Sequence, residues 1–166
     1  AFYRSVQNLR STLALGITTV RDASGADAGL RIAVEEGTLA GPRMQVSISM
    51  LSMTGGHNDP WLPSGTHGVF GIEYPGMPSG VCDGVDGVTA KVREMIRAGA
   101  DVIKIASSGG FLSPSDDPME PNFSQDEVDA IVRAAADLGT FVMSHAHGPE
   151  GIKRAVRAGV RSIDHG

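Results

Sequence analysis

Three side chains suited to metal or proton chemistry, Lys104, His145 and His165, lie within or directly after short runs of β-prone residues. His145 closes the run TFVMSHA (140–146), and His165 closes the run VRSIDHG (160–166). If these runs are neighbouring parallel strands, their carboxyl ends meet at one edge, and the two imidazoles can converge on one point. The pair therefore predicts a metal site, whereas His145 alone would more often be a core histidine.

Lys104 is the one cation in the run DVIKIA (101–106). Alternation along a strand puts it on the same face as Val102 and Ala106, and a run that is apolar on both faces is typical of a parallel sheet covered by helices. Lysine is seldom buried without a partner. Its place just before the glycine-rich segment 107–110 has two explanations: the ammonium snorkels to water at the strand end, or it belongs to a functional site.

The remaining histidines occupy different positions relative to the strands. His57 follows two glycines in TGGH (54–57) and is either a loop residue bonded to backbone or part of the site. His147 lies two residues beyond His145 on the same face, which predicts contact with the rim of the site or with the substrate instead of metal binding. His67 lies in a long loop and is expected to be solvated.

The elements that would position these side chains form a loose internal repeat. Each unit is a helix-period segment that ends in Leu-Gly or Ala-Gly, where glycine supplies a left-handed cap, followed by a β-prone run. A capping box at Ser124–Glu127 and a proline at Pro149 mark two of the helix starts. The capping glycines are Gly16, Gly41, Gly99, Gly139 and Gly159. The expected strands are 17–23, 43–51, 101–106, 140–146 and 160–166, and the expected helices are 5–15, 28–37, 84–98, 125–138 and 150–158.

Five helix-then-strand units in succession predict an α/β fold whose parallel sheet has right-handed crossovers. The spacing favours a partial (β/α)₈ barrel of the TIM type, with about five parallel strands. An open doubly wound sheet is the alternative, but no G-x-G-x-x-G follows any strand. Catalytic side chains of such barrels come from the carboxyl ends of strands, where the polar residues of this chain repeatedly fall.

Composition excludes several classes of protein. The chain has 166 residues, of which 41% are hydrophobic and 20% charged, as in an ordinary globular domain. A net charge of −5 without a basic run argues against nucleic acid as a partner. No apolar run approaches the ~20 residues of a membrane span, and no signal-peptide pattern is present, so we expect no membrane partner and a cytoplasmic location. The single cysteine, Cys82, excludes an internal disulfide and a cysteine-based zinc site.

Both ends of the sequence have an unusual form. The chain does not begin with Met, and it stops at Asp164-His165-Gly166, directly after a strand-like run. We therefore expect residues 1–166 to be the central portion of a single barrel domain that is truncated at both ends.

Seven motifs follow one another along the chain. They are GITTVRDASG (16–25), GPRMQVS (41–47), MTGGHND (53–59), GADVIKIASSGGFLSP (99–114), FSQDEVDAIV (123–132), SHAHGPEGI (144–152) and AGVRSIDHG (158–166). Their order and spacing resemble the amidohydrolase superfamily, in particular its imidazolonepropionase-like and Xaa-Pro dipeptidase-like members. The resemblance covers nearly the whole chain and implies a metal-dependent hydrolase on a (β/α)₈ barrel.

The resemblance also implies roles for individual residues. Lys104 matches the lysine that is carboxylated and bridges two divalent metals, usually zinc, while His145 and His165 match ligands of the second metal. These three are the candidate catalytic and metal-binding residues, and His57 and His147 are the candidate substrate-binding residues. The chemistry is consistent, because desolvation disfavours the ammonium form, and a neutral amine can take up carbon dioxide to give a carbamate that suits bridging.

The superfamily pattern is present only in part. The H-x-H pair of the first barrel strand has no counterpart before residue 16, and the aspartate that acts as general acid/base would follow residue 166. Asp164 belongs to the strand of His165 and is not that aspartate. An aromatic residue often replaces His147 in dipeptidase-like members, which leaves the substrate class open. We expect the isolated chain to be inactive.

The sequence thus predicts a hydrolase that cleaves an amide bond in a small-molecule, dipeptide-like or cyclic amide substrate with metal-activated water. A homo-oligomer is one expectation for the full-length protein. Two alternatives stay open. A strand lysine is also found in Schiff-base aldolases, although an aldolase has no need of His145 and His165. A non-catalytic barrel fragment would expose sheet edges and would aggregate or pair with another chain.

Overall fold

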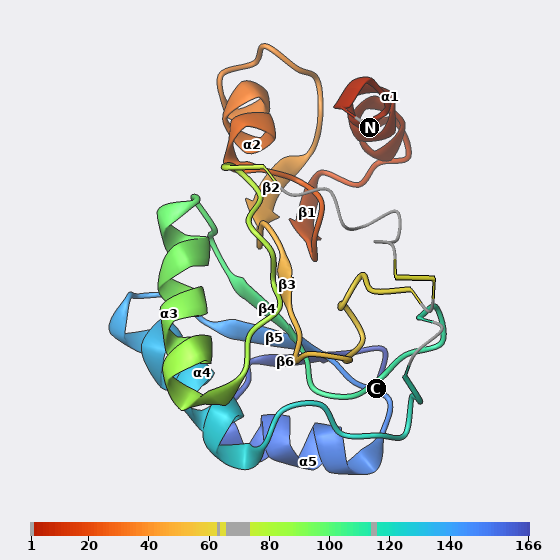
Figure 1. Cartoon of the computed structure of the whole chain (residues 1–166). Helices are drawn as coiled ribbons and strands as arrows, with labels where there is room; N and C mark the ends of the chain where they lie inside the picture. The colour runs from red at the N-terminus through yellow and green to blue at the C-terminus, as the bar shows by residue number, and fades with distance from the viewer. Residues whose placement is uncertain (1, 63, 66–73, 114–115) are drawn as a thin grey trace.

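The computed structural model alternates helices and strands along the chain, and it describes residues 2–62, 64–65, 74–113 and 116–166 (Figure 1). All pairings between the named strands are parallel, which confirms the α/β architecture. The elements are α1 (Phe2–Ala14), β1 (Thr19–Asp22), α2 (Ala28–Glu35), β2 (Arg43–Val46), β3 (Met50–Leu51), α3 (Gly84–Arg97), β4 (Ile103–Ala106), α4 (Gln125–Asp137), β5 (Val142–His145), α5 (Pro149–Ala158) and β6 (Ser162–Asp164).

The strands form two groups, β1-β2 and β3-β4-β5-β6, with α3, α4 and α5 around the outside of the larger sheet (Figure 1). The prediction of one continuous strand over 43–51 is wrong. Ile48 takes a left-handed conformation with φ 68°, and the amide of Ser49 donates to the carbonyl of Ser47 at 2.9 Å. This tight turn divides the strand, so that β2 pairs with β1 and β3 pairs with β4.

A reciprocal contact joins the two groups of strands near the amino end of β4. The amide of Val46 donates to Oδ2 of Asp101 at 2.9 Å, and the amide of Asp101 donates to the carbonyl of Val46 at 2.8 Å. Arg31 of α2 lies 3.2 Å from the same carboxylate. A second contact lies before β5 and β6, where the guanidinium of Arg161 stacks 4.1 Å above the ring of Phe141. The amino ends of β4, β5 and β6 are thus stabilised by contacts of their own, which for β4 are made with the carboxyl end of β2 and with α2.

Helix ends follow the expected signals with one exception. The capping box at Ser124 is present, Pro149 lies in the first turn of α5, and Gly159 takes φ 88° after its last turn. Gly16, Gly99 and Gly139 are also left-handed. The exception is Gly41, which caps nothing, because α2 ends at Glu35 and Gly37 supplies the left-handed residue with φ 75°.

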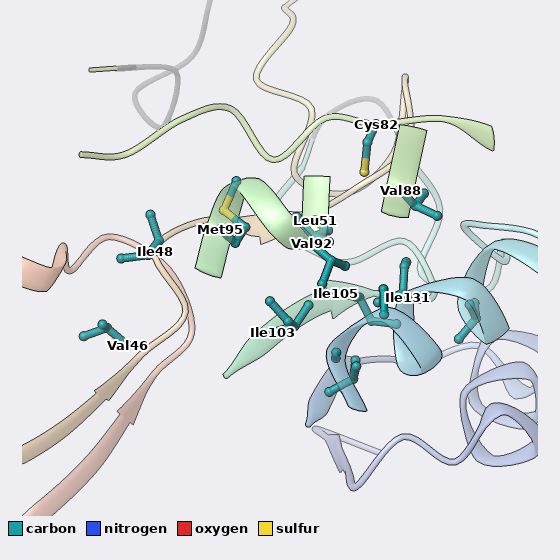
Figure 2. Close-up of a cluster of buried hydrophobic side chains, with 14 of the residues drawn as sticks. Val46, Ile48, Leu51, Cys82, Val88, Val92, Met95, Ile103, Ile105 and Ile131 are labelled. Carbon is teal, nitrogen blue, oxygen red and sulfur yellow. The ribbon is translucent and has the colours of Figure 1, made fainter. Parts of the chain in front are cut away.

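The core lies between the strands and the helices α3 and α4, where apolar side chains meet in one cluster (Figure 2). Ile103 and Ile105 of β4 belong to this cluster, as do Val92 of α3 and Ile131 of α4. Lys104, between the two isoleucines, is directed to the opposite face by strand alternation. The buried face of β4 therefore anchors the strand, and its other face is left to carry chemistry.

Replacing Ser124 with alanine is expected to destabilise the protein by ~1 kcal/mol, the usual cost of losing an N-cap. The hydroxyl of Ser124 accepts from the amide of Glu127 at 3.3 Å, and the Glu127 carboxylate accepts from the Ser124 amide at 2.6 Å. Denaturant unfolding of the full-length protein measures the change. Thr89→Ala is the control, because the Thr89 hydroxyl donates to the carbonyl of Val85 within its own helix. Equal losses in both variants would contradict the capping role.

Candidate functional site

The register of the sheet brings the ends of three strands to the same level. Ala106 at the end of β4 pairs with His145 at the end of β5, and His145 pairs with Asp164 at the end of β6. His165 follows directly, with φ 76°. Lys104 lies two residues before Ala106 on β4, so its long side chain can reach the same edge. The predicted convergence of the strand ends is therefore present.

Four imidazole rings gather at this edge. The ring of His57 stacks on that of His145, with centroids 4.2 Å apart and planes at 12°. The centroid of His145 also lies 4.9 Å from that of His165 and 4.8 Å from that of His147. The ring centroids of His147 and His165 are 5.5 Å apart. We refer to these four residues as the histidine cluster. His67 lies outside the described residues.

Lys104 is buried, with 3% of its side chain exposed, and its ammonium pairs with the carboxylate of Asp164. Burial lowers the pKa of Lys104, and the contact with Asp164 opposes that shift. The alternative in which this lysine snorkels to water is wrong, because its ammonium is buried and paired with a carboxylate. Sequence reasoning assigned no role to Asp164. The signal was available, since the residue ends the strand next to that of His145.

His145 has a defined hydrogen-bonding arrangement. Its Nε2 lies 3.0 Å from the carbonyl oxygen of Gly109. A carbonyl only accepts, so Nε2 carries the hydrogen and Nδ1 keeps its lone pair. Burial lowers the pKa of His145 to about 4, against the opposing effect of the Gly109 bond. The ring is therefore neutral near pH 7, and the lone pair on its Nδ1 is the one that could serve as a ligand.

His57 is held by the loop that follows β4. Its Nδ1 lies 2.9 Å from Oγ of Ser113 and 3.4 Å from Oδ2 of Asp116. Gly110 lies against the same ring, because an ideal Cβ there would come within 2.1 Å of Cε1 of His57. Burial lowers the pKa of His57, and the nearby carboxylate of Asp116 opposes the change. The structure thus brings His57 into the cluster, together with a serine and an aspartate that sequence reasoning missed.

His147 is half-buried and lies two residues beyond the end of β5. Its backbone amide donates to Oγ of Ser108 at 2.8 Å. The ring of Phe111 meets its imidazole edge-on at 4.8 Å, and Phe111 is 77% exposed. An apolar, accessible surface therefore adjoins the polar cluster on the loop after β4.

The donor chemistry at this edge fits a divalent metal, since imidazole nitrogens and carboxylate or carbamate oxygens are common ligands of zinc and related ions. The arrangement is not that of a formed metal centre. In the part of the chain that the structure describes, no three His, Cys, Asp or Glu side chains are placed to hold an ion. The rings pack against one another, and Lys104 is occupied by Asp164. Lys104 could serve as a metal ligand only if this ion pair opened.

Three known proteins are similar to this chain over nearly its whole length. Ochratoxinase of Aspergillus niger is 39% identical over 158 aligned residues, which cover 90% of this chain and 33% of the ochratoxinase. A prolidase solved with N-methylphosphonate-L-proline has 45% identity and a TM-score of 0.86, over 97% of this chain and 40% of the prolidase. A Xaa-Pro dipeptidase solved with methionine in its active site has 43% identity and a TM-score of 0.83, over 96% of this chain and 39% of the dipeptidase.

The chain thus spans about a third of the curated relative and two fifths of the solved ones. The solved neighbours are barrel proteins, which agrees with the partial barrel predicted from the repeat. A sequence model described as the amidohydrolase family matches residues 1–166. Because that match runs from the first residue to the last, this chain belongs to the amidohydrolase family.

Proposed function

We propose that the full-length protein containing this chain is a metal-dependent hydrolase that cleaves an amide bond in a dipeptide-like or cyclic amide substrate. This proposal depends on one observation. The buried Lys104 of β4 lies at the same edge of the sheet as the four imidazoles of the histidine cluster. Members of the amidohydrolase family generally use divalent metals. The similarity to a prolidase and to ochratoxinase supports an amide substrate.

Lys104, His145 and His165 are the residues that would hold the metals, with zinc as the expected ion. The Nδ1 lone pair of His145 is available for this role because Nε2 is committed to Gly109. Once Lys104 separates from Asp164, its burial favours the neutral amine, which can add carbon dioxide and lose a proton to become a carbamate. Bound divalent ions would acidify a water molecule and polarise the substrate carbonyl.

The remaining residues of the edge would bind and orient the substrate. His57 and His147 flank His145 on two sides and are the candidates for hydrogen bonds to polar groups next to the scissile bond. The exposed ring of Phe111, in contact with His147, offers an apolar surface nearby. We therefore propose a substrate that combines an amide with an apolar side chain.

The Schiff-base alternative is not favoured by any contact of Lys104. An aldolase lysine must meet a substrate carbonyl, but this side chain is 3% exposed and its amine pairs with Asp164. The histidine cluster would also have no role in that chemistry.

The part of the chain that the structure describes contains no helix that is long and apolar enough to cross a membrane.

Removal of bound metal is expected to lower activity on a Xaa-Pro dipeptide by about a thousandfold, because the nucleophile and the electrophilic assistance are lost together. The full-length protein would be dialysed against a chelator, assayed, and assayed again after zinc is restored. Circular dichroism before and after chelation checks that the fold is retained. Full activity in the metal-free protein would refute the proposal. Borohydride trapping of substrate on Lys104 would instead favour the aldolase.

A further inference from the structure

Asp116 is a buried carboxylate to which the proposed metal chemistry gives no role. It lies on the loop that follows β4, and only 3% of its side chain is exposed. Its Oδ2 accepts from the amide of Gly110 at 3.0 Å and lies 3.4 Å from Nδ1 of His57. Its Oδ1 is buried and has no hydrogen-bond partner among the residues that the structure describes. A carboxylate that is buried and only partly satisfied is costly to keep.

The described contacts of this carboxylate lie around the imidazole ring of His57. Gly110, which donates to Asp116, lies against one side of the His57 imidazole, and His145 stacks on that imidazole at 4.2 Å. Ser113, three residues before Asp116, lies 2.9 Å from Nδ1 of the same ring. The loop thus holds His57 through a hydrogen-bonding edge and a ring face.

The charge of Asp116 also determines which nitrogen of the neutral ring carries hydrogen. A carboxylate oxygen can only accept, so a hydrogen on Nδ1 is favoured when Oδ2 lies beside it. Ser113 can accept from the same Nδ1 hydrogen through its hydroxyl oxygen. Nε2 then keeps its lone pair, and no hydrogen bond joins Nε2 to any of the described residues. The ring is left with an acceptor available to a ligand.

We propose that Asp116 is a positioning residue that fixes the orientation and tautomer of His57, so that Nε2 of His57 accepts a hydrogen bond from the substrate. This inference rests on the proposed function, in which His57 contacts the substrate. Asp116 itself acts only through His57. Its side chain would be retained for this reason despite the cost of burying a charge.

A double-mutant cycle on the full-length protein tests the coupling. Asp116→Ala and His57→Ala are each expected to lower kcat/KM for a Xaa-Pro dipeptide about tenfold, mainly through KM, as for loss of one hydrogen bond to a polar group. In the His57→Ala background, Asp116→Ala should have no further effect. Asp116→Asn keeps an acceptor for the Gly110 amide and should show an intermediate loss. Asp117→Ala is the matched control, because that neighbouring carboxylate accepts from the amide of Met119 instead.

Additive losses in the cycle, or full kcat/KM in Asp116→Ala, would overturn the inference. If Asp116→Ala does not fold, Asp116→Asn carries the same cycle with the same criteria. Nitrogen-15 spectra of labelled histidine give a second result that does not depend on activity. The parent should show His57 protonated on Nδ1, and Asp116→Ala should shift it toward Nε2. An unchanged tautomer refutes the role of Asp116, whereas the expected tautomer shift without any dipeptide hydrolysis by the parent would point to failure of the proposed function alone.

Discussion

Replacing Lys104 with alanine is expected to remove bound metal from the full-length protein and to lower kcat/KM by at least about a thousandfold, the scale on which metal-activated water contributes. Lys104 carries the only polar side chain of β4, and as a carbamate it would supply the bridging oxygens. That side chain is 3% exposed, so solvent cannot easily take its place. Elemental analysis of the purified variant gives metal per chain, and initial rates on a Xaa-Pro dipeptide give the activity.

The matched control is Lys91→Ala, which removes a lysine from an ion pair on α3, 2.7 Å from Glu94. Such a pair contributes at most ~1 kcal/mol and should leave metal content and rates unchanged. A short-chain carboxylic acid added to Lys104→Ala should restore part of the activity, because it can supply the missing oxygen ligands in the cavity left behind. Full metal content and full activity in Lys104→Ala would show that the bridging role is wrong.

A methyl group added at Gly110 is expected to lower kcat/KM by about a hundredfold, because it displaces catalytic groups by more than the tolerance of an ordered site. The ideal Cβ would lie 2.1 Å from Cε1 and 2.5 Å from Nδ1 of His57, so either the ring or the loop must move. Movement of the ring also breaks its stacking on His145. Steady-state kinetics of Gly110→Ala measure the loss, and a crystal structure of the variant would locate the displaced ring.

Gly87 provides the comparison for this second variant. It lies within α3, and a Cβ there would meet nothing within 4 Å. Gly87→Ala should therefore retain full activity and gain up to ~1 kcal/mol of stability, since alanine is the better helix former. If Gly110→Ala were as active as Gly87→Ala, the close packing of His57 against the loop would not matter for activity.

Much of the fold could be predicted from local patterns. Helix periods, capping residues and β-prone runs recur in a fixed order, and each is a short-range signal that the barrel context reinforces. The division of the strand over 43–51 could not be predicted in this way. It depends on a left-handed Ile48, and a β-branched residue is a poor candidate for that conformation. In the structure Ile48 is fully buried and its carbonyl accepts from the amide of Gly25 at 3.2 Å, and contacts of this kind leave no local pattern in the sequence.

The candidate site was likewise only partly predictable from the sequence. The gathering of His145 and His165 follows from the rule that parallel strands end at a common edge, so their positions in the sequence were sufficient. Asp116 and His57 come from separate loops, and nothing periodic relates them. Loop contacts depend on tertiary packing, and the glycines at 109 and 110 were the one local indication that another chain segment approaches closely.

The contacts that stabilise the amino ends of the strands lie apart from the candidate site. Asp101, Arg31 and the Arg161–Phe141 stack lie at one end of the sheet, whereas the histidine cluster lies at the other. Mutations selected for heat tolerance can accumulate around the first end without disturbing the second. A directed-evolution library confined to the amino-terminal rim is therefore expected to raise the stability of the scaffold and to leave the histidine cluster undisturbed.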